Sequence, residues 1–185
     1  MDERKPMTTV GILLIGLKLL VICAAVAAVV AGVYFLTEDR CEENIRLQKR
    51  EAILEIFAGQ QVEYSEKAIE DCVLYTVTSD GATVGYCVEV ASPGFGGDVS
   101  LMVGYLADGT VKSVSVVSHS ETPGLGSVVC EEAYLEQYGA GLSGVLTLGE
   151  DVDAKAGATV TSRAILSGVN RATELLQGFL TGGAK

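Results

Sequence analysis

The hydrophobic and polar positions divide the chain into an apolar N-terminal run and a mixed remainder. Residues 10–36 contain one charged side chain, Lys18, and residues 19–36 form an uninterrupted apolar run. A helix needs about 20 such residues, at about 1.5 Å each, to cross the roughly 30 Å hydrocarbon core of a bilayer. The pattern therefore predicts a transmembrane helix over residues 10–36, preceded by a short N-terminus at residues 1–9.

The charges on either side of this run predict its orientation. Arg4, Lys5 and Lys18 lie towards the N-terminus, whereas the segment TEDRCEEN that follows the run is mostly acidic. Because basic flanks stay in the cytoplasm, we expect a single-pass protein of the cell (inner) membrane with a cytoplasmic N-terminus and an extracytoplasmic domain. A cleaved signal peptide is an alternative, but its apolar core would have only roughly 7–15 residues. Lipoprotein processing at Cys23 is disfavoured by the bulky residue Ile22 before it.

Beyond the span, helical periodicity gives way to strand periodicity. Residues 37–60 have apolar positions at helical spacing and predict a linking helix. Two β-rich runs follow, at residues 72–90 and 99–118, and each contains a central Asp-Gly pair. Asp-Gly between alternating apolar positions is a strong hairpin signal. The pattern therefore predicts two hairpins in an antiparallel sheet.

Helical spacing returns in the last third of the chain. It predicts a helix around Val128–Tyr138 and a final helix from about Ser162. Both would cover the sheet, which gives an α+β domain over residues 61–185 on an N-terminal transmembrane helix.

Charge and cysteine content narrow the function classes. The part beyond the span has 10 basic and 22 acidic residues, which makes nucleic acid and anionic lipid headgroups poor partners. Its cysteines are Cys41, Cys72, Cys87 and Cys130, with no CxxC pair. Cys72 and Cys87 lie on either side of the first predicted hairpin and form the preferred disulfide pair, while free thiols are the alternative.

Two glycine-rich loops have an unusual composition. Residues 91–98, ASPGFGGD, surround Phe95 with glycines, so the backbone can approach a ligand closely and the aromatic ring can contact a flat one. Residues 119–126, HSETPGLG, contain the single histidine of the chain. His119 and Glu121 lack the additional ligands of a metal site and the positioned nucleophile of a hydrolytic triad. We therefore expect neither a metal site nor a hydrolytic site here.

A third loop, DVDAKAGATVTS at residues 151–162, places a threonine among small residues. Ala156, Gly157 and Ala158 leave Thr159 accessible, and a helix start with Ser or Thr as the N-cap is one explanation. A threonine hydroxyl is a poor nucleophile without a base, so any reaction at Thr159 would need another protein to activate it. A helix N-terminus favours a bound anion such as phosphate.

In this order, the segments GFGG, HSETPGLG and DAKAGATVTS resemble the FMN-binding domain of two related proteins. These are the G subunit of Rnf complexes and the C subunit of sodium-translocating NADH:quinone reductases. The short chain and the segment GFGGDVSLMVG are more similar to the Rnf protein. The resemblance covers nearly the whole chain, including the N-terminal span.

The resemblance implies a covalent flavin. In that family a flavin transferase joins FMN through its phosphate to the threonine after Gly-Ala, which corresponds to Thr159. Asp153, Gly157 and Ala158 match the acceptor pattern, whereas Ala156 replaces its usual hydroxyl residue. The implied cofactor-binding residues are Glu121, Thr122, Gly124, Leu125, Gly126, Gly157, Ala158, Thr159, Thr161 and Ser162.

The same resemblance implies an electron-transfer subunit, not catalytic alone, of an ion-translocating ferredoxin:NAD oxidoreductase. Its partners would be the other membrane subunits of the complex. The chain has no GxGxxG fingerprint of its own for a dinucleotide. One alternative is a stand-alone extracytoplasmic flavin electron carrier, and another is a membrane-tethered binding or sensor module without covalent flavin.

Overall fold

The computed structural model describes residues 9–57, 62–69, 72–139 and 141–182. Helix α1 (Thr9–Ile56) is continuous through the predicted span and through the described part of the predicted linking helix. Its segment Leu13–Thr37 has a mean hydropathy of 2.8, and it is long and apolar enough to cross a membrane. The chain divides into two compact units, Met1–Arg46 and Leu47–Lys185. The last turns of α1 therefore belong to the second unit, which also contains the sheet.

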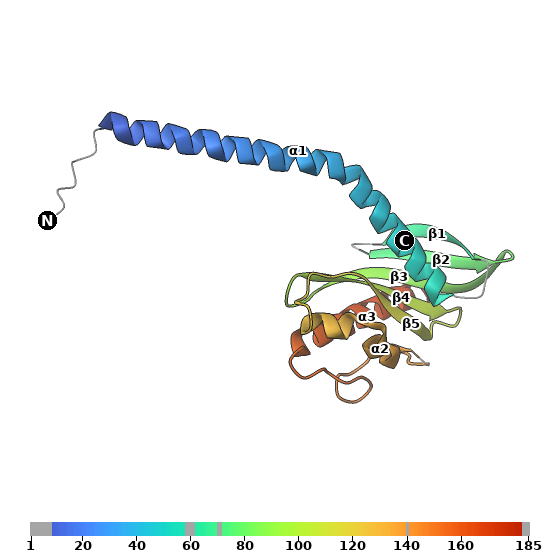
Figure 1. Cartoon of the computed structure of the whole chain (residues 1–185). Coiled ribbons are helices and arrows are strands. Elements are labelled where there is room, and N and C mark those ends of the chain that lie inside the picture. Colours follow the sequence, from blue (N-terminus) through green and yellow to red (C-terminus); the bar gives the residue numbers. More distant parts are fainter. Residues whose placement is uncertain (1–8, 58–61, 70–71, 140, 183–185) are drawn as a thin grey trace. The chain divides into compact units, whose positions relative to one another are not determined.

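The second unit is built on an antiparallel sheet whose described strands follow one another in chain order (Figure 1). Both predicted hairpins are confirmed, and Asp80 and Gly81 in the first turn have positive φ angles of 51° and 80°. Such angles define the tight turn that Asp-Gly favours. The strands are β1 (Glu63–Ile69), β2 (Cys72–Ser79), β3 (Ala82–Pro93), β4 (Asp98–Leu106) and β5 (Val111–Ser118).

Strand β1 was not predicted from the sequence. It lies at the edge of the sheet, where six of its seven residues are exposed. Its sequence EYSEKAI therefore lacks the alternation of a half-buried strand. Polar and charged side chains are typical of such an edge, because they discourage pairing with another chain.

Helix α3 (Thr159–Leu180) covers one face of the sheet (Figure 1). The main core lies between them and includes Leu101, Tyr105 and Ile165. Gly168 allows the close approach, because a Cβ there would lie 2.5 Å from Leu101 Cδ1 and 2.7 Å from the Ser92 hydroxyl. The helix predicted around Val128–Tyr138 is instead three short turns, η1 (Gly126–Cys130), α2 (Glu132–Leu135) and η2 (Glu136–Tyr138).

The last turns of α1 pack on the opposite face of the sheet. Ile53, Ile56 and Phe57 are buried there against a second core that includes Cys87 and Met102. Two strand glycines, Gly85 and Gly104, leave the room that this helix end needs.

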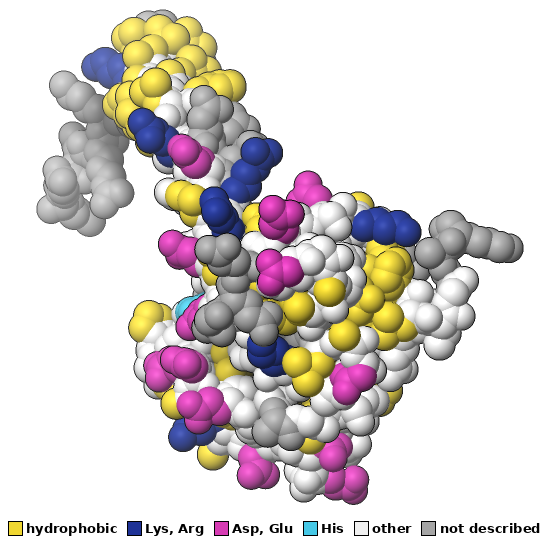
Figure 2. All heavy atoms as spheres, turned by 90° about the vertical axis from the view of Figure 1, so that its right-hand side faces the viewer, with side chains coloured by type: hydrophobic (Ala, Val, Ile, Leu, Met, Phe, Trp, Pro, Cys, Tyr) yellow, Lys and Arg dark blue, Asp and Glu magenta, His cyan; other side chains and the backbone are white. Residues whose placement is uncertain are grey.

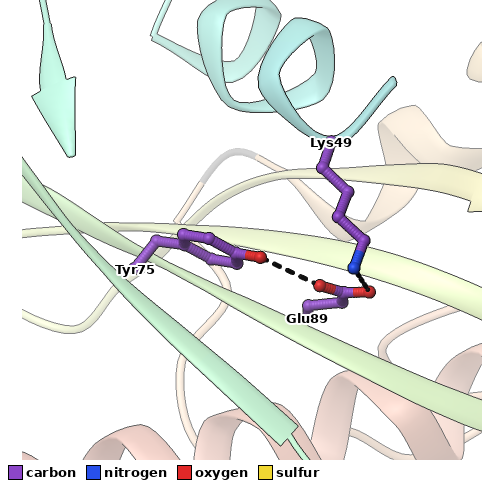
Figure 3. A network of polar contacts seen from close by, with 3 residues as sticks. All are labelled: Lys49, Tyr75 and Glu89. Atoms are coloured by element: carbon purple, nitrogen blue, oxygen red, sulfur yellow. Dashed lines mark hydrogen bonds and ion pairs between the residues drawn. The ribbon is translucent and has the colours of Figure 1, made fainter. Parts of the chain in front are cut away.

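A polar contact fixes the same helix end to the sheet (Figure 3). Lys49 Nζ of α1 lies 2.9 Å from Glu89 Oε1 of β3, and the Tyr75 hydroxyl of β2 donates to Glu89 Oε2 at 3.0 Å. The side chains of Lys49 and Glu89 are 28% and 17% exposed, so the pair is partly shielded from solvent.

The preferred disulfide prediction was wrong, because Cys72 and Cys87 point to opposite faces of the sheet. Cys72 belongs to the core beneath α3, whereas Cys87 belongs to the core beneath α1. In the strand register Cys87 faces Tyr75, three residues beyond Cys72. An odd number of residues along a strand reverses the side of the sheet, so no disulfide can join the two thiols. The side chain of Cys41 lies outside the described residues.

Candidate functional site

The first turn of α3 carries Thr159, on which the sequence-based site prediction centres. Gly157 has a left-handed backbone, with φ 88°, that directs the loop into the helix, and Ala158 is the N-cap. No side chain of the described residues caps this end, so the first amide groups of a 22-residue helix remain available. They give this end a partial positive charge, and the Thr159 side chain is exposed beside them.

Helix α3 begins at Thr159, three residues before the predicted start at Ser162. Ser162 is buried, and its hydroxyl donates to the Ala158 carbonyl at 3.0 Å. The Ser162 hydroxyl oxygen also accepts the Lys155 backbone N–H at 3.2 Å. Ser162 therefore closes the loop that leads into the helix.

Glu121 joins two of the three loops. Its side chain is only 5% exposed, and its Oε1 accepts the backbone N–H groups of Phe95, at 2.7 Å, and Gly96, at 3.3 Å. Gly94 and Gly126 are needed around it, because a Cβ at either position would overlap its carboxylate. The other oxygen, Oε2, is buried without a hydrogen-bond partner in the described part of the chain. Such an oxygen is costly unless a ligand donates to it.

Side chains of the short turns after β5 hold the third loop in place through hydrogen bonds. The Tyr134 hydroxyl donates to the Asp153 carbonyl at 2.7 Å, and the Asp153 N–H donates to Gln137 Oε1 at 2.7 Å. Gly157 approaches the second loop closely enough that a Cβ there would lie 3.5 Å from Leu125 Cδ1. These contacts position the start of α3 next to the other two loops.

The three loops enclose a pocket of about 220 Å³. Eight of the ten predicted cofactor-binding residues line it, whereas Gly124 and Ser162 do not. Phe95 and Val160 complete the lining, and Phe95, Leu125 and Val160 are large apolar side chains that stay substantially exposed. Val160 was missed because a valine in a helical pattern suggests core packing, yet here it is 53% exposed. The eight are Glu121, Thr122, Leu125, Gly126, Gly157, Ala158, Thr159 and Thr161.

Two side chains that carry reactive groups, His119 and Cys130, lie near the pocket. His119 is exposed, and its Nδ1 accepts the Glu121 backbone N–H at 3.2 Å, which fixes the turn before Glu121. Burial raises the pKa of the Cys130 thiol to about 11, with smaller contributions from the negative charges of Glu121 and Glu131. The thiol is therefore protonated at neutral pH. Within the described ranges no group of His, Cys, Asp and Glu is arranged to hold a metal ion.

Comparison with known families gives the class of protein. Residues 94–174, which include every residue that lines the pocket, match the model of the FMN-binding domain. Residues 6–56 match the model of the RnfG N-terminal region. Strands β4 and β5, most of α3 and the residues that line the pocket therefore belong to an FMN-binding domain, preceded by a helix of the RnfG type.

Comparison with individual proteins identifies the family within this class. The chain is 30% identical over 191 residues to the G subunit of the ion-translocating oxidoreductase complex of Haemophilus influenzae, covering 90% of this chain and 88% of the relative. It is 29% identical over 172 residues to the G subunit of the proton-translocating ferredoxin:NAD(+) oxidoreductase complex of Clostridium ljungdahlii, covering 90% and 91%. A solved structure, NqrC of Shewanella oneidensis, aligns with a TM-score of 0.46 and 23% identity over 57% of this chain and 62% of that one. The chain belongs to the family of G subunits of Rnf-type ion-translocating oxidoreductase complexes.

Proposed function

We propose that this chain is a membrane-anchored flavoprotein subunit that carries FMN covalently on Thr159 and relays electrons within an Rnf-type complex. The observation that carries this proposal is the meeting of three separate loops in one pocket, with the Thr159 side chain exposed in its lining. The family assignment supports FMN as the cofactor, and the names of the relatives support the role in an ion-translocating oxidoreductase.

The start of α3 suits a phosphate ester on Thr159. Its uncapped amide groups and the helix dipole favour an anion there. The neighbours before Thr159 are small, and Gly157 is exposed, so a flavin transferase would have access to the hydroxyl. A basic residue is not required to hold the phosphate once it is covalently attached.

The remaining walls suit a flat, polar-edged ring. Leu125 and Phe95 offer exposed apolar surface, and the buried Glu121 Oε2 offers an acceptor to a ligand N–H or O–H. The pocket is smaller than the roughly 300–1,000 Å³ of sites that enclose a drug-sized ligand. Part of the cofactor would therefore stay accessible to electron-transfer partners. When bound, FMN supplies the electron-transfer chemistry, and the chain supplies attachment, position and a partly apolar environment.

The anchor and its orientation belong to the same proposal. The apolar segment Leu13–Thr37 supports a membrane span, and the basic residues before it support a cytoplasmic N-terminus. The FMN-binding domain would then lie outside the cytoplasm, where a covalent link prevents loss of the cofactor. The other membrane subunits of the complex would be its partners.

Flavin attachment can be tested by co-expressing the full chain with a flavin transferase and measuring flavin fluorescence of the denatured band on a gel. We expect a fluorescent wild-type band and complete loss of fluorescence in Thr159→Val, which removes the hydroxyl but keeps the shape of the side chain. Thr161→Val is the matched control, because it makes the same change two residues further along the same helix turn. We expect it to retain the label.

Two results would contradict the proposal. A label that survives in Thr159→Val would mean that another residue is the acceptor. An unlabelled wild-type band, made with a transferase that labels a known acceptor in the same cells, would favour a module without covalent flavin.

A further inference from the structure

A larger groove, here called the α3 groove, lies between α3 and the edge strand β1. It encloses about 1120 Å³. Its basic side chains are Lys67 from β1 and Arg163 and Arg171 from α3. Its apolar surface includes Leu166, Leu175 and Phe179 of α3. The groove is thus a partly apolar channel edged by positive charge.

The charge of the α3 groove is opposite to that of its surroundings. Residues 47–185 contain 18 acidic and 8 basic side chains, and acidic side chains are spread over the visible face of the sheet domain (Figure 2). Among the described residues, three of those eight basic side chains and one acidic side chain, Glu174, line the groove. A concentration of basic residues on an acidic domain indicates an acidic partner at this place.

The spacing of the basic groups indicates an extended partner. Arg163 and Arg171 are eight residues apart, which is about 12 Å along a helix, and Phe179 lies a further 12 Å or so along it. The Lys67 ammonium group lies 5.4 Å from the Phe179 ring centroid, and so marks that far end. Cations spread over about 24 Å of helix suit an extended partner better than a single phosphate group. A strand of about seven residues, at about 3.4 Å each, spans them.

One wall of the α3 groove is held in place by hydrogen bonds. Asn170 Oδ1 accepts the Leu146 N–H at 2.8 Å, and its amide donates to the Leu146 carbonyl at 2.9 Å. This pair fixes the neighbouring Val145, which is 62% exposed and lines the groove. A preformed wall with exposed apolar surface lowers the ordering cost of binding.

We propose that the α3 groove docks a carboxylate-rich, extended segment of a partner protein. In an extended segment alternate side chains point to opposite sides, so its acidic residues can lie near the three cations while its apolar residues contact the partly exposed Leu175 and Phe179. Thr159 lies one turn before Arg163 on the same side of α3. A docked partner would therefore lie next to the pocket of Thr159. This last consequence rests on the proposed function, whereas the docking itself does not.

Docking can be measured with the full chain in nanodiscs of zwitterionic lipid and a fluorescein-labelled heptapeptide of alternating Glu and Leu. We expect the anisotropy to report binding that weakens as salt is added. Arg163→Glu combined with Arg171→Glu should weaken it by about 10-fold or more, because two attractive pairs become repulsive. Both side chains are exposed, so the sheet signal in circular dichroism should be unchanged.

The matched control is Arg46→Glu combined with Arg50→Glu, which changes the net charge equally at two exposed sites on α1 outside the groove. Equal loss of affinity in this control, or equal binding of a peptide with Gln in place of Glu, would overturn the proposal. Full competition by inorganic phosphate would indicate a small-anion site instead. Charge-dependent binding to phosphatidylglycerol vesicles without peptide binding would indicate a lipid surface. Self-association that the groove variant abolishes would indicate a second copy of the chain.

Discussion

Gly104 of β4 faces Ile56 of α1, so a substitution at Gly104 tests how the end of α1 packs on the sheet. A methyl group at Gly104 would overlap Ile56 Cγ2 and lie 3.3 and 3.4 Å from Ile56 Cδ1 and Cβ. Carbon atoms pack favourably at about 3.5–4.0 Å, so Ile56 or the last turn of α1 has to move. Ile56 is 5% exposed and has little free space to move into. We expect Gly104→Ala to lower the free energy of unfolding by about 1–3 kcal/mol.

A double-mutant cycle isolates this contact. Ile56→Ala alone should cost about 2–5 kcal/mol, because it removes buried methyl groups and leaves a cavity. In the double variant the new methyl group at Gly104 would fill part of that cavity. The double variant should therefore be more stable than the sum of the two losses predicts, by at least about 1 kcal/mol. The measurement is urea unfolding of the full chain in detergent, followed by the circular dichroism of the sheet.

Gly178→Ala provides the matched control on α3. A Cβ at Gly178 meets no atom within 4 Å, so the variant should gain about 0.5–1 kcal/mol from the better helix former. Additive losses in the cycle, or a Gly104→Ala variant as stable as Gly178→Ala, would refute the packing argument.

Two further predictions concern buried polar groups. Lys49→Met should destabilise the domain by about 1–3 kcal/mol, because the partly buried Glu89 carboxylate loses its ion pair. A loss below about 0.5 kcal/mol in urea unfolding would contradict a stabilising ion pair. Burial raises the pKa of the Cys87 thiol from 9.0 to about 12, although the positive charge of Lys112 opposes this shift to a smaller extent. Burial likewise raises the pKa of the Cys130 thiol from 9.0 to about 11. At pH 8, both thiols of the folded protein should therefore react with iodoacetamide at least about 100-fold more slowly than those of the urea-unfolded protein. Equal rates in the folded and unfolded protein would contradict this prediction. Since both pKa values rise on folding, their stabilising contribution is complete below about pH 9 and is lost as the pH rises through 11 to 12.

Local sequence determined the elements whose signals are contained in a few residues. The Asp-Gly turns fix the two hairpins because these residues suit positive φ angles, which Asp80 and Gly81 adopt in the first turn and Gly109 adopts in the second. The apolar run of α1 is likewise recognisable from composition and length alone. The loop motifs around Phe95, Glu121 and Thr159 were visible as three separate segments, and eight of the ten residues predicted from them line one pocket.

The strand register and the edge strand β1 could not be predicted from the sequence. Strand β1 has no buried face to produce alternation, so only its pairing with β2 defines it. The distance between Cys72 and Cys87 along the hairpin suggested a disulfide, but the strand register places them on opposite faces. A shift of one residue reverses the side on which a strand residue lies, and composition does not record that shift.

The sequence by itself determined a place for an anion, because small residues and a threonine at a helix start have local chemical consequences. Its resemblance to the FMN-binding domain implied which residues would hold a flavin there. Only the tertiary structure decided how they act together. Glu121 bonds to backbone amides some 25 residues earlier in the chain, and Ser162 closes a loop instead of capping its helix. The α3 groove is also tertiary, because Lys67 of β1 and Arg163 and Arg171 of α3 line one groove only in the folded chain. These features depend on contacts between distant segments, whose energies exist only once the chain has folded.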